Sequence, residues 1–385
     1  MSRSVLKTKI CDMIGMEYPV FCAGMGNIYF GMKSVTGSKL AAAVSEAGGV
    51  GVIGAAMMTL DEMHQAIREV KELTKKPFGV DLLLPSGVEE NAGDLSGLKN
   101  ISIKELQEYL PKEQREFVDS LMKELNVKDI SFEPNLNMTL MRPRDAVDIC
   151  LEEKVPVFAA GLGNPAFMVD DAHAQGMVVM GLVGNVKNAK RVAASGVDII
   201  IAQGTEAGGH TGRVGTLALI PQVVDAVSPV PVLAAGGIAD GRGLAAALAL
   251  GAEGVWVGTA FIATDESDDY RFNKEKIVSA DEEGTKITKI FTGKTMRGIK
   301  NELMRRWDEA GLATLPMPLQ SLLMADLVCG LIEEERTDYI SPPGGQAAGL
   351  VKEIRPAREV LEHIVGGAID ILTVDIPNRV EAKEK

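Results

Sequence analysis

The sequence predicts an α/β fold: a (β/α)8 TIM barrel with an insertion after its third strand and a mostly helical C-terminal appendage. Short apolar runs that end in glycine alternate with Ala-, Leu-, Glu- and Lys-rich stretches of helical spacing. The runs are apolar almost throughout, which parallel strands need when helices cover both faces of the sheet. Eight such steps fit a barrel of about 250 residues. A doubly wound open sheet shows the same alternation and is the alternative fold.

The eight steps can be placed along the chain. The predicted strands are Pro19–Cys22, Val50–Ala55, Phe78–Leu84, Pro156–Ala160, Met177–Val183, Val197–Ala202, Val230–Ala235 and Gly254–Thr259. The predicted helices between them are Ser38–Ala47, Asp61–Lys75, Arg144–Glu153, Pro165–Gln175, Asn185–Ser195, Leu217–Val227 and Gly241–Leu250. Asp61 is expected to cap its helix, because a carboxylate can accept an N–H of the first turn. The eighth helix is expected beyond Phe261.

Two regions interrupt this alternation. Residues 85–143 are polar and charged, with helix-like pieces at Ser102–Tyr109 and Lys112–Asn126. Beyond residue 267, helical spacing returns at Ile299–Ala310, Leu319–Glu334 and Arg355–Ile371. We therefore expect a barrel over residues 10–267, an inserted lid or cap over 85–143, and a helical appendage over 268–385.

Composition and charge narrow the function. The 385 residues include 40 Lys and Arg and 53 Asp and Glu, so the net charge is −13. An acidic chain lacks the basic surface that binds nucleic acid or anionic membranes. The N-terminus lacks the apolar core of a signal peptide, and no apolar run reaches the roughly 18 residues of a membrane span. We expect a soluble cytoplasmic protein that acts on a small molecule, and its assembly as a homo-oligomer stays open.

Glycines gather after the predicted strands, where a barrel binds its ligands. The seventh strand ends in A-A-G-G-I-A-D-G at Ala234–Gly241, and the eighth in V-G-T-A-F at Val257–Phe261. Two neighbouring glycine-rich turns are typical of a phosphate cup, because backbone N–H groups can approach the anion. The plainer interpretation is that these glycines only permit tight turns.

His210 is the candidate catalytic residue. It is one of four histidines and lies in Q-G-T-E-A-G-G-H-T-G at Gln203–Gly212, directly after a predicted strand. An imidazole titrates near neutral pH and suits proton transfer. No metal site is expected, because Glu206 and His210 have no second histidine nearby and the four cysteines form no C-x-x-C pair. Gly161–Ala166 matches a dinucleotide fingerprint, but the next strand ends without the acidic residue such a site needs.

Several of these segments carry a resemblance to a known family. L-A-A-A-V-S-E-A-G-G-V-G at Leu40–Gly51, K-P-F-G-V at Lys76–Val80, A-Q-G-T-E-A-G-G-H-T-G at Ala202–Gly212 and the two glycine-rich strand ends carry it. The chain resembles the nitronate monooxygenase (2-nitropropane dioxygenase-like) family of FMN enzymes, which is related to FMN-dependent enoyl-acyl-carrier-protein reductases. The resemblance covers at least residues 10–84 and 144–267.

The resemblance implies a TIM barrel that holds FMN without a covalent bond. It places Ala23, Gly24 and Met25 beside the isoalloxazine ring. Asp81 stands where members commonly carry an asparagine that contacts the flavin. The resemblance also implies that Gln203, Gly208 and Gly209 line the ribityl chain and the approach to the phosphate. Around the phosphate itself it implies Gly236, Gly237, Gly258 and Thr259. His210 matches the histidine regarded as the catalytic base, and a cationic His210 could instead stabilise an anion.

Three functions follow as hypotheses. The first is an FMN-dependent monooxygenase that oxidises alkyl nitronates with dioxygen. The second is an NAD(P)H-dependent flavin reductase of enoyl thioesters or quinones. The third is a flavin-binding barrel without catalysis, which the intact glycine turns and His210 disfavour. Besides Asp81, the chain departs from the family pattern in its 85–143 insertion and in a longer first loop at Asn27–Gly31.

Overall fold

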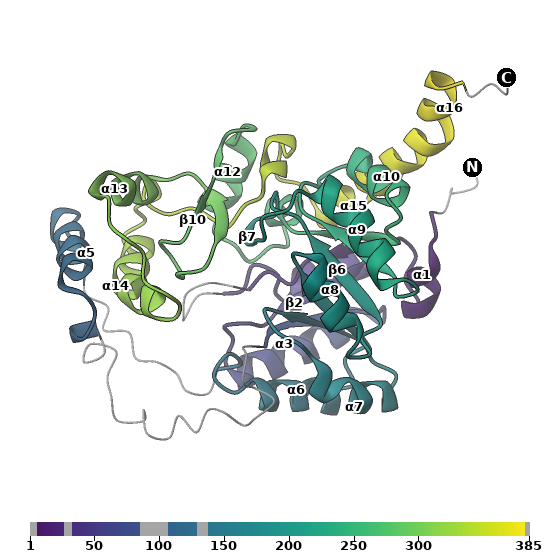
Figure 1. Cartoon of the computed structure of the whole chain (residues 1–385), viewed down its shortest axis with the longest axis horizontal. Helices are drawn as coiled ribbons and strands as arrows, with labels where there is room; N and C mark the ends of the chain where they lie inside the picture. The colour runs from purple at the N-terminus through teal and green to yellow at the C-terminus, as the bar shows by residue number, and fades with distance from the viewer. Residues whose placement is uncertain (1–5, 27–32, 85–106, 129–137, 382–385) are drawn as a thin grey trace.

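The computed structural model describes residues 6–26, 33–84, 107–128 and 138–381. Within them, eight parallel strands close into a barrel in the order β1-β2-β3-β4-β5-β6-β8-β9 (Figure 1). The strands are β1 (Val20–Cys22), β2 (Val50–Gly54), β3 (Gly79–Leu83), β4 (Val157–Gly161), β5 (Val178–Val183), β6 (Ile199–Gln203), β8 (Val232–Ala235) and β9 (Gly254–Val257). Each coincides with a predicted strand, and the closed order excludes the open sheet.

Helices follow the strands and cover the barrel. They are α2 (Ser38–Glu46), α3 (Leu60–Leu73), α6 (Pro143–Glu152), α7 (Val169–Ala174), α8 (Val186–Ala193), α9 (Thr216–Val227) and α10 (Gly241–Ala249). A 3-10 turn, η3 (Ala166–Met168), leads into α7. The predicted Asp61 cap is wrong. Thr59 caps α3, accepting the Glu62 N–H while Glu62 accepts the Thr59 N–H, and this reciprocal pair satisfies two free donors at once.

The N-terminal helix α1 (Lys9–Ile14) closes the barrel interior at the end where the strands begin. Its Ile10 and Cys11 are buried in the same cluster as the inward-facing residues of the strands, among them Phe21 and Trp256. The Thr8 hydroxyl donates to the Glu253 carbonyl just before β9. With this end plugged, the open end of the barrel is the one at which its strands terminate.

The eighth helix of the barrel comes from the far end of the chain. α15 (Ala357–Asp370) packs between α10 and α2, and a side chain on Gly241 would collide with the α15 backbone at Gly367 and Ala368. Thr264 and Arg355 form a bridge where the chain leaves the barrel and where it returns. We therefore propose a division different from the expected appendage at 268–385: residues 265–354 form an excursion between the last strand and the last helix. Beyond α15 the chain continues through η5 (Ile371–Asp375) and α16 (Ile376–Arg379).

The excursion and the described part of the 85–143 insertion share one hydrophobic core. α5 (Lys112–Glu124) from the insertion packs against α14 (Leu319–Glu333), with α13 (Glu302–Ala310) beside them (Figure 1). We call residues 107–128 and 285–340 the appended unit. Its core comprises Leu110, Val118, Leu121, Val127, Ile290, Phe291, Met296, Leu303, Met304, Trp307, Leu323, Met324, Leu327, Val328, Leu331, Tyr339 and Ile340. The helix expected over Ser102–Tyr109 begins outside the described residues.

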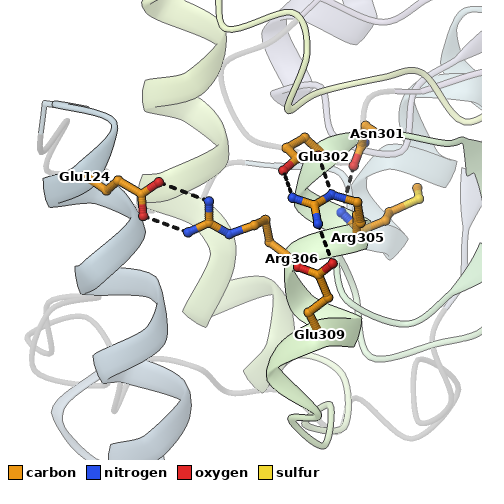
Figure 2. Close-up of polar contacts among 7 residues, drawn as sticks. Glu124, Asn301, Glu302, Arg305, Arg306 and Glu309 are labelled. Carbon is orange, nitrogen blue, oxygen red and sulfur yellow. Dashed lines mark hydrogen bonds and ion pairs between the residues drawn. The ribbon is translucent and has the colours of Figure 1, made fainter.

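Surface ion pairs accompany this shared core, as Figure 2 shows. The Arg306 guanidinium on α13 donates hydrogen bonds to both carboxylate oxygens of Glu124 on α5, at 3.0 and 2.7 Å. Arg305 lies between Glu302 and Glu309. Asn301 caps α13 by accepting the Met304 N–H. The predicted helix Ile299–Ala310 therefore starts too early, because Ile299 pairs within a strand and the Asn301 cap sets the helix start.

The excursion is also not purely helical. After α12 (Arg271–Ser279), β10 (Thr285–Thr288) and β11 (Met296–Ile299) pair antiparallel, and β11 pairs in turn with the two-residue strand β7 (Gly209–His210). This small sheet joins the excursion to the barrel at His210. A 3-10 turn, η4 (Gln346–Leu350), and the short helix α11 (Thr259–Ile262) lie near the same junction. Among the described residues, no helix has both the length and the apolar composition needed to cross a bilayer.

Candidate active site

Two polar side chains point into the open end of the barrel. Successive residues of a strand face opposite sides. Ile199 and Ile201 lie in the interior cluster, so Gln203 at the end of β6 faces inward as well. Asp81 on β3 pairs in register with Ala159, another interior residue. The strands therefore direct both predicted residues to the place where a barrel binds ligands.

Asp81 lies at the side of this opening formed by β1 and β3. A Cβ on Gly24 would come within 2.2 Å of the Asp81 Cβ, so only glycine fits opposite this carboxyl. No described residue pairs with the carboxyl through a hydrogen bond or an opposite charge. Burial therefore raises the pKa of Asp81 well above its ordinary value. This shift favours the protonated, uncharged form of the carboxyl.

The first loop is fixed beside Asp81 and β9. The Thr36 hydroxyl donates to the Ala23 carbonyl at 2.8 Å and accepts the Met25 N–H at 3.2 Å. The Met25 sulfur lies 3.4 Å from the position that a Cβ on Gly258 would take. Ala23, Gly24 and Met25 thus form a rigid rim between β3 and β9. Asn27–Gly31, the longer part of this loop, lies outside the described residues.

His210 is held at the rim by contacts from both the barrel and the appended unit. Its carbonyl accepts from the Gln203 Nε2 at 2.6 Å, and its backbone pairs with Met296 on β11. Its Nε2 lies 3.0 Å from the Thr292 hydroxyl. Burial, and secondarily the nearby charge of Lys294, lower the pKa of His210 to about 4. At neutral pH the imidazole is uncharged and can accept a proton.

Glycine turns form the opposite side of the opening, after β8 and β9. Gly236 and Gly237 have φ angles of +99° and +74°, in the left-handed region that favours glycine. The N–H groups of Gly237 and Gly258 meet no acceptor among the described residues. Thr259 follows Gly258, and its hydroxyl accepts the Gly345 N–H at 2.9 Å. These turns offer free backbone donors to an anion.

The turn after β6 is shaped by Glu206. Its carboxylate accepts the Thr216 N–H and the Thr216 hydroxyl, at 2.9 and 2.7 Å. These bonds hold the negative charge of Glu206 at the start of α9. A Cβ on Gly208 would come within 2.8 Å of the Gly344 backbone, so Gly208 lies against a segment of the excursion. Gly209 has a φ of +69°.

That segment, P-P-G-G-Q at Pro342–Gln346, is a part of the site that sequence reasoning missed. The Gln346 N–H donates to the Glu206 carbonyl at 2.9 Å. A Cβ on Gly345 would come within 2.6 Å of the same carbonyl oxygen. Its two glycines after two prolines could have indicated a close approach of the backbone to a ligand, but they do not follow a barrel strand, where such turns were sought. Thr292 was missed as well, because a lone threonine in a turn carries no pattern.

The structure thus brings all the predicted site residues to the open end of the barrel, on two facing sides. One side has the Asp81 carboxyl, whose pKa is raised, beside Gly24, and the other has the turns at Gly236, Gly237, Gly258 and Thr259. An uncharged imidazole stands at the rim beside Gln203. Within the described part of the chain, no three His, Cys, Asp or Glu side chains are grouped as metal ligands. Such an arrangement can bind an elongated anionic ligand and move a proton.

Known proteins share this architecture. A family model described as nitronate monooxygenase matches residues 7–367. A Staphylococcus saprophyticus protein named as a nitronate monooxygenase is 32% identical, over 95% of this chain and 99% of its own length. The structure of FabK from Thermotoga maritima aligns with a TM-score of 0.74 at 32% identity, covering 97% of this chain and 100% of that one. That of a nitroalkane oxidase from Streptomyces ansochromogenes gives 0.76 at 27% identity, covering 94% and 99%.

Proposed function

Because the chain belongs to the nitronate monooxygenase family and is an oxidoreductase, we propose that it binds FMN and oxidises alkyl nitronates with dioxygen. The observation that carries this proposal is the His210 imidazole, which stands uncharged at the opening of the barrel. A proton acceptor in this place suits substrates that ionise at the carbon beside a nitro group.

The site fits FMN on grounds of its own chemistry. Gly237 and Gly258 offer unpaired N–H groups, and Gly237 has a φ angle of +74°, which favours glycine at this turn. The chain has a net charge of −13, so backbone N–H groups are the expected donors to one phosphate, in place of a cluster of basic side chains. Gly208, Gly209 and Gln203 would line the ribityl chain, and Ala23, Gly24, Met25 and Asp81 would border the ring. When bound, FMN would supply the electron transfer that oxidation requires.

His210 would act as the base rather than as a cationic anchor. With a pKa of about 4, it carries almost no charge at pH 7, so stabilisation of an anion by an imidazolium is disfavoured. The neutral ring can remove the α-proton of a nitroalkane, or donate a hydrogen bond through its N–H when the substrate enters as the nitronate. The Gln203 amide and the pairing with β11 hold the His210 backbone and so orient the ring.

The test is an absorbance spectrum of the purified protein followed by aerobic turnover of an alkyl nitronate and its parent nitroalkane. We expect a flavin spectrum, dioxygen uptake without reduced nicotinamide, and a loss of turnover of about 10²–10⁴-fold on the nitroalkane in His210→Ala. FMN occupancy should stay high in this variant. His173→Ala is the matched control, because His173 contacts Asp198 outside the barrel opening. Unchanged turnover in His210→Ala would remove the base role.

A second candidate function is an NAD(P)H-dependent flavin reductase of enoyl thioesters or quinones. The 32% identity to FabK over 97% of this chain supports it. Anaerobic addition of NADH or NADPH separates the two candidates. Bleaching of the flavin within seconds, with no dioxygen-dependent turnover of nitronate, would favour the reductase.

A further inference from the structure

Asp81 is a site residue with a carboxyl group that ordinarily carries a negative charge, but here it lies among uncharged residues. Its carboxyl faces the opening of the barrel but has no partner among the described residues. Asp81 is half-buried, so a ligand that fills the opening would complete its burial, and a carboxyl left without a hydrogen bond would then cost about 1–3 kcal/mol. A ligand that enters the opening is the group available to satisfy it.

The surroundings of Asp81 favour its protonated form. Gly24 covers it from the first loop, Gly54 ends β2 with Ala55 directly after it, and Ala159 and Gly161 lie on β4. None of these residues carries a charge. α6 has Arg144, Asp145 and Asp148, but it packs with Ala146 and Val147 against the outer face of β3, where Val80 and Leu82 point. No titratable group among the described residues faces the carboxyl.

A carboxylic acid in this state is a hydrogen-bond donor as well as an acceptor. The phosphate-binding turns follow β8 and β9, and β3 lies three strands from β9 around the barrel. Asp81 therefore belongs to the end of the site that the flavin ring would occupy, away from the phosphate charge. A flavin ring carries its carbonyl oxygens and the N1 and N5 nitrogens as acceptors along its edge, and its N3–H is a donor.

We propose that Asp81 remains a neutral acid when FMN is bound and donates a hydrogen bond to an acceptor on the edge of the flavin ring. This rests on the FMN site proposed above. An ionised Asp81 would place an acceptor against that acceptor, so the affinity for FMN should fall when the carboxyl loses its proton. If Asp81 instead accepted from the flavin N3–H, the affinity would not fall. An asparagine in the same place would donate through its amide at every pH.

The experiment compares FMN dissociation constants across pH 5–10 in the unmodified protein and in Asp81→Asn, measured by quenching of flavin fluorescence. The phosphate of FMN titrates equally in both and cancels in the ratio. We expect equal affinities at low pH. Above the pKa of Asp81, the unmodified protein should lose affinity relative to Asp81→Asn by about tenfold for each pH unit.

Asp148→Asn is the matched control. Burial and neighbouring carboxylates also raise the pKa of Asp148, but this residue lies on α6 outside the barrel. Its variant should follow the unmodified protein at every pH. Parallel pH curves for the unmodified protein and Asp81→Asn would overturn the proposal while leaving FMN binding intact. Failure of the unmodified protein to bind FMN at any pH would overturn both proposals.

An infrared difference spectrum covers the case in which Asp81→Asn does not fold. The unmodified protein, with ¹³C-labelled aspartate, is compared at pH 7 with and without FMN. We expect the carbonyl band of a protonated carboxylic acid to shift when FMN binds. A spectrum in which FMN shifts only ionised carboxylate bands would contradict the proposal without any variant.

Discussion

The barrel and the appended unit are assembled from the chain in opposite ways. In the barrel, each strand pairs with the barrel strand that comes next along the chain, and the helix that covers a strand comes after that strand. After the last strand, β9, the excursion comes before its helix α15. The appended unit joins two segments that lie on either side of most of the barrel, residues 107–128 and 285–340. The barrel core is mainly aliphatic, whereas the appended unit places Trp307, Phe291 and Tyr339 in its core.

This difference matters because both regions meet at one site. The barrel supplies Asp81, Gln203 and the glycine turns at its open end. The excursion supplies Thr292 beside the His210 ring, the strand β11 that pairs with His210, and the Gly345 contact to Thr259. A barrel alone would leave His210 on a glycine-rich loop without these contacts. The appended unit and the segment after it thus set the geometry of a residue that the barrel carries.

The largest expected effect tests whether the two cores unfold separately. Leu327 on α14 is fully buried in the appended unit, and Leu244 on α10 is its matched counterpart in the barrel. Each change to alanine should cost about 2–5 kcal/mol. Leu327→Ala should lower the melting temperature of the appended unit while that of the barrel stays close to its original value.

The chain offers a direct readout of this experiment, because it has two tryptophans and each region holds one. Trp256 lies in the barrel interior and Trp307 in the appended unit. Fluorescence in Trp256→Phe therefore follows the appended unit, and fluorescence in Trp307→Phe follows the barrel. If Leu327→Ala moves both transitions by the same amount, the two regions form one cooperative unit and the comparison above fails.

The next effect tests the contact between the excursion and the glycine turn after β6. In Gly345→Ala the added Cβ would lie 2.6 Å from the Glu206 carbonyl oxygen and 2.9 Å from the Gly208 nitrogen. Both atoms are backbone, so one segment must move, at a cost of about 1–3 kcal/mol. We expect weaker FMN binding, measured by fluorescence titration. Gly366→Ala on α15 meets nothing within 4 Å and should leave FMN affinity unchanged. Equal affinities in both variants would show that the segment can move freely.

The third effect concerns the charge of His210. Because its pKa is about 4, the imidazole stays neutral down to that pH. If it acts as the proposed base, kcat/KM on a nitroalkane should fall only as the pH drops through about 4. At pH 5 this gives about 30-fold more active base than an ordinary histidine of pKa 6.5 would provide. Lys294→Gln removes the secondary cause and should shift the acid limb to higher pH. An acid limb near 6.5 in the unmodified protein would contradict the burial of His210.

The same comparison explains what the sequence could predict. The barrel strands were located to within about two residues, since an apolar run such as Val197–Ala202 is visible within a short window. The glycine turns could be placed at the open end, because parallel strands end at one edge, whereas Asp81 was placed there only by the family resemblance. The return of α15 between α10 and α2 was not predictable, because its apolar face looks like that of any amphipathic helix. The pairing of β7 with β11 depends on residues far apart in sequence, and two residues are too few to form a pattern.

The smallest expected effect concerns the surface contact between the two segments of the appended unit. Arg306 binds Glu124 through two hydrogen bonds, but the pair is solvated and screened by salt. Glu124→Gln should lower the melting temperature of the appended unit, followed through Trp307, by no more than about 2 °C at low salt, and by nothing measurable at about 1 M salt. Asp119→Asn on the same helix is the control. A loss comparable to that of Leu327→Ala would mean that ion pairing, and not the shared apolar core, joins the insertion to the excursion.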